Sequence, residues 1–74
     1  MRQKVFEIVA RIMGVPVEAV TSESSPETLA NWDSLRHMKL ILAIEESLDI
    51  QFNDEDIVSI MNVQDLLSRL EAKR

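Results

Sequence analysis

Residues 31–48, NWDSLRHMKLILAIEESL, decide the fold, because a polar turn is followed at once by a long apolar run without Gly or Pro. Asp33 or Ser34 is placed to cap the N–H groups that a helix leaves unpaired in its first turn. The spacing therefore predicts a helix over residues 34–48. On a helical wheel its apolar side is split into two stripes. One stripe contains His37, Leu40, Ile41, Ile44 and Leu48, and the other contains Leu35, Met38 and Leu42.

A helix in so small a domain cannot easily bury both stripes. Either the helix is central and buried nearly all round, or one stripe faces the core and the other faces partners. We expect Leu40, Ile44 and Leu48 to be buried. Their expected neighbours in the core are Phe6, Ile12, Phe52 and Leu66.

Helical spacing also appears on either side of this stretch. Residues 2–13 have one apolar face, and Gly14 and Pro16 follow where a helix stop is expected. A cap at Asn53 and an acidic first turn precede Ile57, Val58, Ile60 and Met61, which we assign to a short third helix. Asn62 can cap a fourth helix, with Asp65 in the capping-box position and an apolar face of Val63, Leu66, Leu67 and Leu70.

Residues 15–33 have no sustained period and predict a long connection. Its hydroxyl-rich part, residues 21–28, is expected to be solvated, whereas Val15, Val17, Val20 and Leu29 can pin the connection to the core. It is either a plain crossover that lets two helices run parallel or a functional loop. No stretch alternates like a strand. We therefore predict one domain, residues 1–74: an all-α four-helix bundle of three main helices and one short helix, with a long loop between the first two.

Composition excludes several classes of function. The 74 residues include no Cys and one His, so a disulfide framework, a thiolate metal site and a protein-only zinc site are not expected. The net charge of −5 falls mostly in residues 21–52, which disfavours nucleic acid and favours basic protein surfaces. No apolar run is long enough for a membrane span, and no signal peptide is seen. We expect a cytoplasmic protein, monomeric, without a bound metal.

The segment Asp33-Ser34-Leu35, at the head of a helix that ends in Glu45-Glu46, resembles the Asp-Ser-Leu signature of acyl carrier proteins. The similarity extends over roughly residues 5–70, and residues 62–66 resemble the opening of that family's last helix. The resemblance implies a four-helix carrier fold in which the reactive serine begins the second helix. It also implies that Ser34 is esterified to 4′-phosphopantetheine, whose thiol holds acyl groups as thioesters.

On this resemblance the protein is a carrier and not an enzyme. A separate phosphopantetheinyl transferase, using coenzyme A and magnesium, would modify Ser34, and Asp33 would either cap the helix or contact that transferase. Acyl-loading and acyl-transfer enzymes would then dock beside the arm. The residues expected to meet these partners are Leu35, Arg36, Met38, Lys39, Leu42, Glu45 and Glu46.

The chain departs from the common family pattern at two places. Asn31-Trp32 replace the small residues that usually precede the signature, and Trp32 either shields the attachment point or covers the junction of loop and helix. Arg36 and Lys39 stand where fatty-acid carriers usually have acids. We therefore expect a specialised carrier, serving a secondary-metabolite (such as polyketide), lipid or cell-surface pathway. The short ends suggest a stand-alone protein, although a domain excised from a synthase is an alternative.

Other functions remain as alternatives. A peptidyl or aminoacyl carrier would use the same arm, and a helical interaction module would use Ser34 only as a cap. An enzyme built on Asp33, Ser34 and His37 is disfavoured, because one helical turn cannot supply a triad with its oxyanion hole. His37 is expected to be a partly buried packing residue with one hydrogen bond. The acids of residues 49–56 lack the spacing of a calcium loop and are better explained as helix caps.

Overall fold

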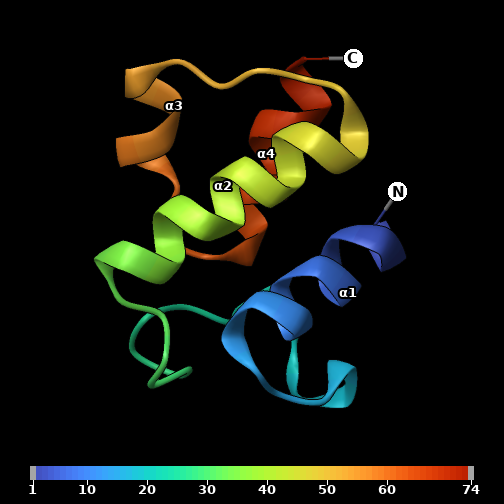
Figure 1. Ribbon diagram of the computed structural model, residues 1–74, viewed down its shortest axis with the longest axis vertical. Helices are drawn as coiled ribbons and strands as arrows, with labels where there is room; N and C mark the ends of the chain where they lie inside the picture. Colours follow the sequence, from blue (N-terminus) through green and yellow to red (C-terminus); the bar gives the residue numbers. More distant parts are fainter. Residues whose placement is uncertain (1, 74) are drawn as a thin grey trace.

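The computed structural model describes residues 2–73, which are helical with no β-strand among them (Figure 1). The elements in chain order are α1 (Arg2–Met13), the 3₁₀ turn η1 (Val17–Ala19), α2 (Ser34–Leu48), α3 (Asp54–Ser59) and α4 (Val63–Ala72). The predicted all-α fold with four helices is confirmed, as are the bounds of the first two helices. None of the described helices has the length and apolar character needed to cross a bilayer.

Helix α3 is shorter than the sequence pattern suggested. Ile60 and Met61, assigned to it from the sequence, follow its last residue, Ser59. Ile60 leaves helical geometry (φ −81°, ψ 106°) and is buried. The chain turns at this point, because the extended backbone carries Ile60 into the core. A helix continued beyond Ser59 would also leave no room for Asn62 to cap α4.

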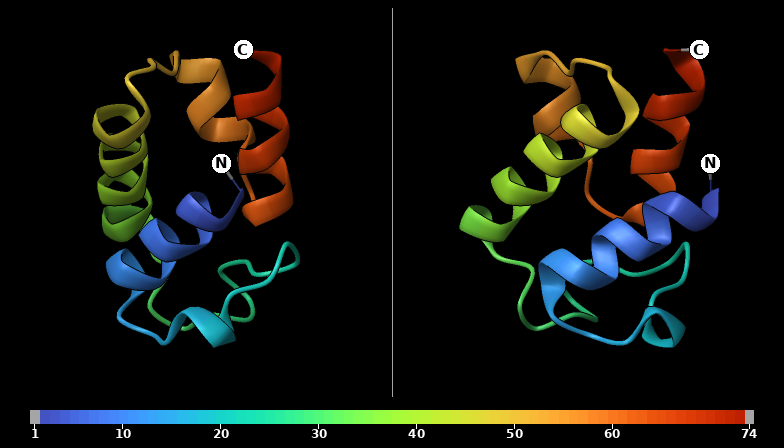
Figure 2. Two further views of the ribbon diagram at one scale, coloured as in Figure 1. Left: turned by 90° about the vertical axis from the view of Figure 1, so that its right-hand side faces the viewer. Right: turned by 45° about the vertical axis from the view of Figure 1, so that its right-hand side comes forward.

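Helix α1 runs opposite to α2 and α4, which share one direction (Figures 1 and 2). The alternative in which the long loop lets the first two helices run parallel is therefore wrong. The loop crosses the end of the bundle below α1 and returns to the start of α2. The start of α2 follows directly from this loop (Figure 2), and its first turn reaches α3, since His37 Nε2 lies 3.0 Å from the Ile57 carbonyl.

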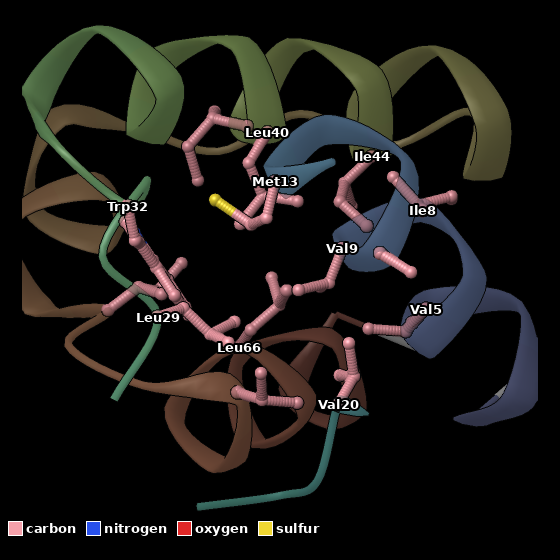
Figure 3. Close-up of a cluster of buried hydrophobic side chains, with 14 of the residues drawn as sticks. Val5, Ile8, Val9, Met13, Val20, Leu29, Trp32, Leu40, Ile44 and Leu66 are labelled. Atoms are coloured by element: carbon pink, nitrogen blue, oxygen red, sulfur yellow. The ribbon is translucent and has the colours of Figure 1, made fainter. Parts of the chain in front are cut away.

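The core lies between α1, α2 and α4 (Figure 3). Leu40, Ile44, Phe52 and Leu66 are buried as predicted. Phe6, Ile12 and Leu48 are only partly buried and pack against the edge of the core. The side chains with almost no exposed surface are Val5, Val9, Met13, Leu40, Ile41, Ile44, Val63 and Leu66.

The helix ends explain why each helix begins and stops where it does. Gly14 has φ +71° just after α1, a backbone conformation that glycine adopts without strain. The Asp33 carboxylate accepts from Arg36 N at 2.8 Å, so Asp33, and not Ser34, caps α2. Asn53 and Asp56 form a reciprocal capping box at α3.

The predicted cap of α4 is confirmed at Asn62, which accepts from Asp65 N at 2.7 Å. Its reciprocal half differs from a capping box, because Asp65 accepts from Met61 N instead of Asn62 N. The Asp65 carboxylate therefore does not bind Asn62 N–H. It holds the backbone of Met61, the residue before the cap.

The long loop is fastened to α4. The carbonyls of Ser24 and Ser22 accept from Val63 N at 2.9 Å and Gln64 N at 2.8 Å, which satisfies two N–H groups that the start of α4 would leave unpaired. Ser24 is 4% exposed, so the expectation of a fully solvated connection is wrong there. Pinning by Val20 and Leu29 is confirmed, since both are buried.

Candidate functional site

The start of α2 presents an exposed serine. Ser34 is the first residue of the helix and follows the cap, Asp33. Within residues 2–73, no hydrogen bond engages the Ser34 hydroxyl. Since Asp33 performs the capping, the hydroxyl of Ser34 is left available for chemistry.

Four hydroxyls of the loop differ from Ser34 in this respect. The side-chain oxygens of Thr21, Ser24, Ser25 and Thr28 each accept a backbone N–H of the loop, at 2.9–3.2 Å. These bonds shape the loop turns and hold the hydroxyls in place. Ser34 therefore differs from these four hydroxyls by the lack of a hydrogen-bond partner.

An open groove of about 890 Å³ lies beside Ser34. The loop supplies one wall and α3 with the residues after it supplies the other, and the start of α2 lies between them. The groove is lined by Glu23, Ser25, Pro26, Glu27, Trp32, Asp33, Ser34, His37, Met38, Ile57, Val58, Ile60, Met61 and Asn62. A flexible group attached to Ser34 would have this surface within immediate reach.

Trp32 and His37 close the inner side of the groove. Trp32 is 3% exposed, and its indole N–H reaches His37 of α2. His37 is partly buried, as predicted, and it makes two hydrogen bonds where one was expected. Its ring contacts Trp32 Nε1 at 3.1 Å and the Ile57 carbonyl at 3.0 Å.

The two stripes of α2 have different environments. Leu40, Ile41 and Ile44 are buried, whereas Leu35 and Leu42 are 65% and 55% exposed and Met38 is also exposed. The expectation that one stripe faces the core and the other faces outward is confirmed; the alternative of a helix buried all round is wrong. The exposed apolar side chains continue across the groove with Val58 and Met61, which sequence reasoning assigned to a helix but not to a site.

Two of the residues expected to meet partners are held by the protein itself. Arg36 is partly buried, and its Nη1 donates to the Ile12 carbonyl near the end of α1 at 2.6 Å. Glu45 accepts from Phe52 N at 2.9 Å. Lys39 and Glu46 are exposed on α2, and within residues 2–73 no carboxylate pairs with Lys39.

The acidic segment before and within α3 has structural partners. Asp56 is buried, and its carboxylate pairs with Lys73 Nζ at 2.8 Å and Arg69 Nη1 at 3.1 Å. The hydrogen bond from Lys73 lowers the pKa of Asp56, with the N–H of Asn53 and the charge of Arg69 acting in the same direction against the effect of burial. Residues 2–73 contain no group of three acidic or histidine side chains that could hold a metal ion.

Comparison with known proteins agrees with this arrangement. Residues 3–70 match the family model described as "Phosphopantetheine attachment site". The chain is 36% identical over 70 residues to an acyl carrier protein of Syntrophobacter fumaroxidans, covering 95% of this chain and 86% of the relative. It is 37% identical over 70 residues to an acyl carrier protein of Bdellovibrio bacteriovorus, covering 95% of this chain and 90% of the relative.

The match over most of the chain defines a phosphopantetheine-bearing carrier. The chain belongs to the acyl carrier protein family, and its prosthetic group is a covalently bound 4′-phosphopantetheine. The geometry beside α2 fits such a group, because an exposed, unbonded hydroxyl opens onto a groove. Membership indicates a carrier of acyl groups and not a catalyst.

Proposed function

We propose that Ser34 carries the 4′-phosphopantetheine arm and that the protein shuttles acyl groups, held as thioesters on that arm, between the enzymes of a specialised pathway. The observation that supports the site most strongly is the exposed hydroxyl of Ser34, which is free of hydrogen bonds while the hydroxyls of Thr21, Ser24, Ser25 and Thr28 are engaged. The start of a helix also suits a phosphodiester, because the unpaired N–H groups and the helix dipole favour negative charge there.

The chemistry at Ser34 is that of an acceptor. Its Oγ bonds to the phosphorus that bears the pantetheine of coenzyme A, and the pyrophosphate bond of coenzyme A breaks. Adenosine bisphosphate leaves, and the hydroxyl proton passes to a base of the transferase. Asp33 is the cap of α2, and its exposed carboxylate is also available to the transferase and the magnesium ion it uses. Once attached, the arm supplies the thiol that holds the acyl group.

Partners dock, on this proposal, on the outer face of α2. Leu35, Met38 and Leu42 form its apolar centre, with Lys39 and Glu46 as charges at its edge. An apolar centre with a charged rim is the usual anatomy of a transient protein interface. Arg36 lies beside this face on α2, but its guanidinium is directed to α1, where it donates to Ile12 O. The Glu45 carboxylate accepts from Phe52 N.

Lys39 is the residue on which pathway choice depends in this proposal. An exposed base on the docking face weakens association with a partner whose docking patch is basic. Basic patches are expected of enzymes that serve acidic fatty-acid carriers, so Lys39 disfavours them. This supports a carrier dedicated to a secondary-metabolite, lipid or cell-surface pathway.

The modification itself is tested by incubating the protein with coenzyme A, magnesium and a broad-range phosphopantetheinyl transferase, followed by intact mass measurement. The parent should gain the mass of one phosphopantetheinyl group. Ser34→Ala should gain none, and Ser47→Ala, which changes another exposed serine of α2, should behave like the parent. If the parent gained no mass, the carrier function would be ruled out for this chain.

Partner choice is tested with Lys39→Glu. The holo variant should be loaded by a malonyl transacylase with a basic docking patch faster than the parent at low salt. The advantage should vanish at an ionic strength of about 1 M, where the Debye length is about 3 Å. Lys4→Glu, the same change in charge at an exposed position of α1, is the control and should leave the rate unchanged. Equal rates for Lys39→Glu and parent at low salt would contradict the role of Lys39.

A further inference from the structure

His37 connects three elements of the protein. On one side of its ring, Trp32 Nε1 of the loop lies 3.1 Å from Nδ1, and on the other the carbonyl of Ile57 in α3 lies 3.0 Å from Nε2. The rings of Trp32 and His37 are also close, with centroids 6.2 Å apart and planes inclined by 22°. His37 itself belongs to the first turns of α2, so the chain of hydrogen bonds runs from loop to α2 to α3.

The chemistry of the two partners fixes the protonation of the imidazole. An indole N–H only donates, so Nδ1 of His37 must accept and carries no proton. A carbonyl only accepts, so Nε2 must carry the proton. The arrangement therefore requires the neutral ring with its proton on Nε2.

Helix α3 depends on this bond. It has six residues, and the carbonyls of its last turn have no partner within the helix. In a longer helix, Ile57 O would accept from Met61 N, but Met61 N donates to Asp65. His37 Nε2 takes the place of that missing donor and joins α3 to α2.

Protonation of His37 affects its two partners differently. The Nε2–H bond to Ile57 O persists in the charged ring, and as a charge-assisted bond it becomes stronger. A proton on Nδ1, however, faces the indole N–H of Trp32, and two donors cannot share a hydrogen bond. Trp32 must then move away from the ring, while α3 stays.

The charged groups around the ring lie mainly on the loop side. Glu23, Glu27 and Asp33 line the same groove, and their carboxylates attract an imidazolium. Arg36 of α2 is directed to Ile12 O. The buried acid of α3, Asp56, is paired with α4 through Arg69 and Lys73. The acidic side chains that line the groove beside His37 are therefore those of Glu23, Glu27 and Asp33.

We propose that His37 is a pH-sensitive positioning residue: in its neutral form it latches Trp32 to the start of α2, and its protonation releases Trp32 and reshapes the groove beside Ser34. The latch is a property of the unmodified chain. Its consequence for the arm, which would then lie against a different surface, rests on the proposed role of Ser34. A histidine ordinarily changes charge between pH 5 and 8, within the range a living cell meets.

The experiment uses the two reporters that the chain offers, its single His and single Trp. Unmodified protein labelled with ¹³C and ¹⁵N is titrated from pH 8 to pH 5, and NMR follows the imidazole carbons and the Trp32 indole N–H. The indole signal should move in one step together with the imidazole titration. Its solvent exchange, corrected for the intrinsic effect of pH, should accelerate severalfold to roughly tenfold, as expected when one hydrogen bond is lost. Ser34→Ala should give the same result, so failure of the latch is distinguishable from failure of the carrier function.

Two variants make the test specific. His37→Gln keeps a donor for Ile57 O but does not titrate, so its indole signal should stay constant between pH 5 and 8. Trp32→Phe removes the indole donor, so the backbone amide signals of the loop, which should move with the imidazole signal in the parent, should no longer do so. If the indole stayed protected while the imidazole titrated, or if the loop amides of Trp32→Phe still moved with the imidazole as in the parent, the latch would be refuted. If His37→Gln does not fold, the indole signal of the parent and the loop amides of Trp32→Phe still decide between these outcomes.

Discussion

Arg36 shows how far one residue can depart from its apparent place on a helix. Arg36 and Lys39 are three positions apart, which separates them by about 60° on the helix surface. That small rotation brings Arg36 against α1, where it donates to Ile12 O, and leaves Lys39 in solvent. Asn31 contributes in the same way, since its Nδ2 donates to Met13 O at 2.9 Å. Two side chains thus satisfy carbonyls that the end of α1 leaves unpaired.

Replacing Arg36 with Met should therefore destabilise the protein. The change removes a charge-assisted hydrogen bond to a helix end while keeping a long apolar stem, and the expected loss is roughly 1–3 kcal/mol in the free energy of unfolding. Lys39→Met is the matched control on the same helix and should change stability by less than about 0.5 kcal/mol. Urea denaturation of both variants is the measurement. Similar values for the two variants would mean that Arg36 is a surface charge after all.

Ile44 tests the assignment of the two stripes of α2. Its side chain is fully buried, so truncation to Ala should leave a cavity and cost about 2–5 kcal/mol. Leu42→Ala, on the exposed stripe of the same helix, should cost far less. Thermal or urea unfolding distinguishes the two. If Ile44→Ala unfolded like the parent, the buried face of α2 would have been identified wrongly.

Among the helices, α3 is the shortest and has the fewest hydrogen bonds within itself. Six residues cannot form a stable helix in isolation. Its start is held by the capping box of Asn53 and Asp56, and its last turn by His37. Asp56 further ties it to α4 through Arg69 and Lys73. The position of α3 against the groove is thus set by polar contacts more than by apolar burial.

The pH dependence of stability should reveal the Asp56 contacts. Because the pKa of Asp56 is lowered in the folded protein, the unfolded chain takes up the proton first as the pH falls. The stabilisation is therefore fully present above about pH 4, the ordinary range of an aspartate, and is lost as the pH drops through the lowered pKa. Asp56→Asn should unfold at lower urea than the parent at pH 7, and this difference should shrink below about pH 4.

The control for that measurement is Asp54→Asn, an exposed acid in the first turn of the same helix. It should follow the parent closely at both pH values. A difference between Asp56→Asn and the parent that stayed constant down to pH 3 would contradict the account of Asp56.

For the whole molecule, the sequence was sufficient where local spacing decides the structure. The apolar period of residues 34–48 and the stop at Gly14 predicted two helices with the bounds observed, and Asn62 was predicted correctly as a cap. The long loop was harder, because its anchors lie about forty residues away in the chain. Nothing local indicates that Ser22 and Ser24 offer their carbonyls to the start of α4. The direction of Arg36 and the bond from His37 to Ile57 depend on tertiary packing in the same way.

The candidate site likewise combines residues that the sequence indicated with a groove that depends on tertiary packing. Ser34 stands out in the sequence by its motif, and Leu35, Met38 and Leu42 by their spacing. The groove could not be predicted, since it forms only where the loop, α2 and α3 meet. Val58 and Met61 were missed as surface residues because apolar side chains in a short helix look like core until the packing is known.

The attachment of the arm to Ser34 can be tested by locating the arm on the chain. Trypsin, which cleaves after Arg11 and Arg36, releases residues 12–36, a peptide that contains Thr21, Ser22, Ser24, Ser25, Thr28 and Ser34. Fragmentation of this peptide from the holo protein should place the phosphopantetheinyl group on Ser34 alone, whose hydroxyl is exposed and unbonded. A modification on any of the loop hydroxyls, or on no residue of this peptide, would contradict the account.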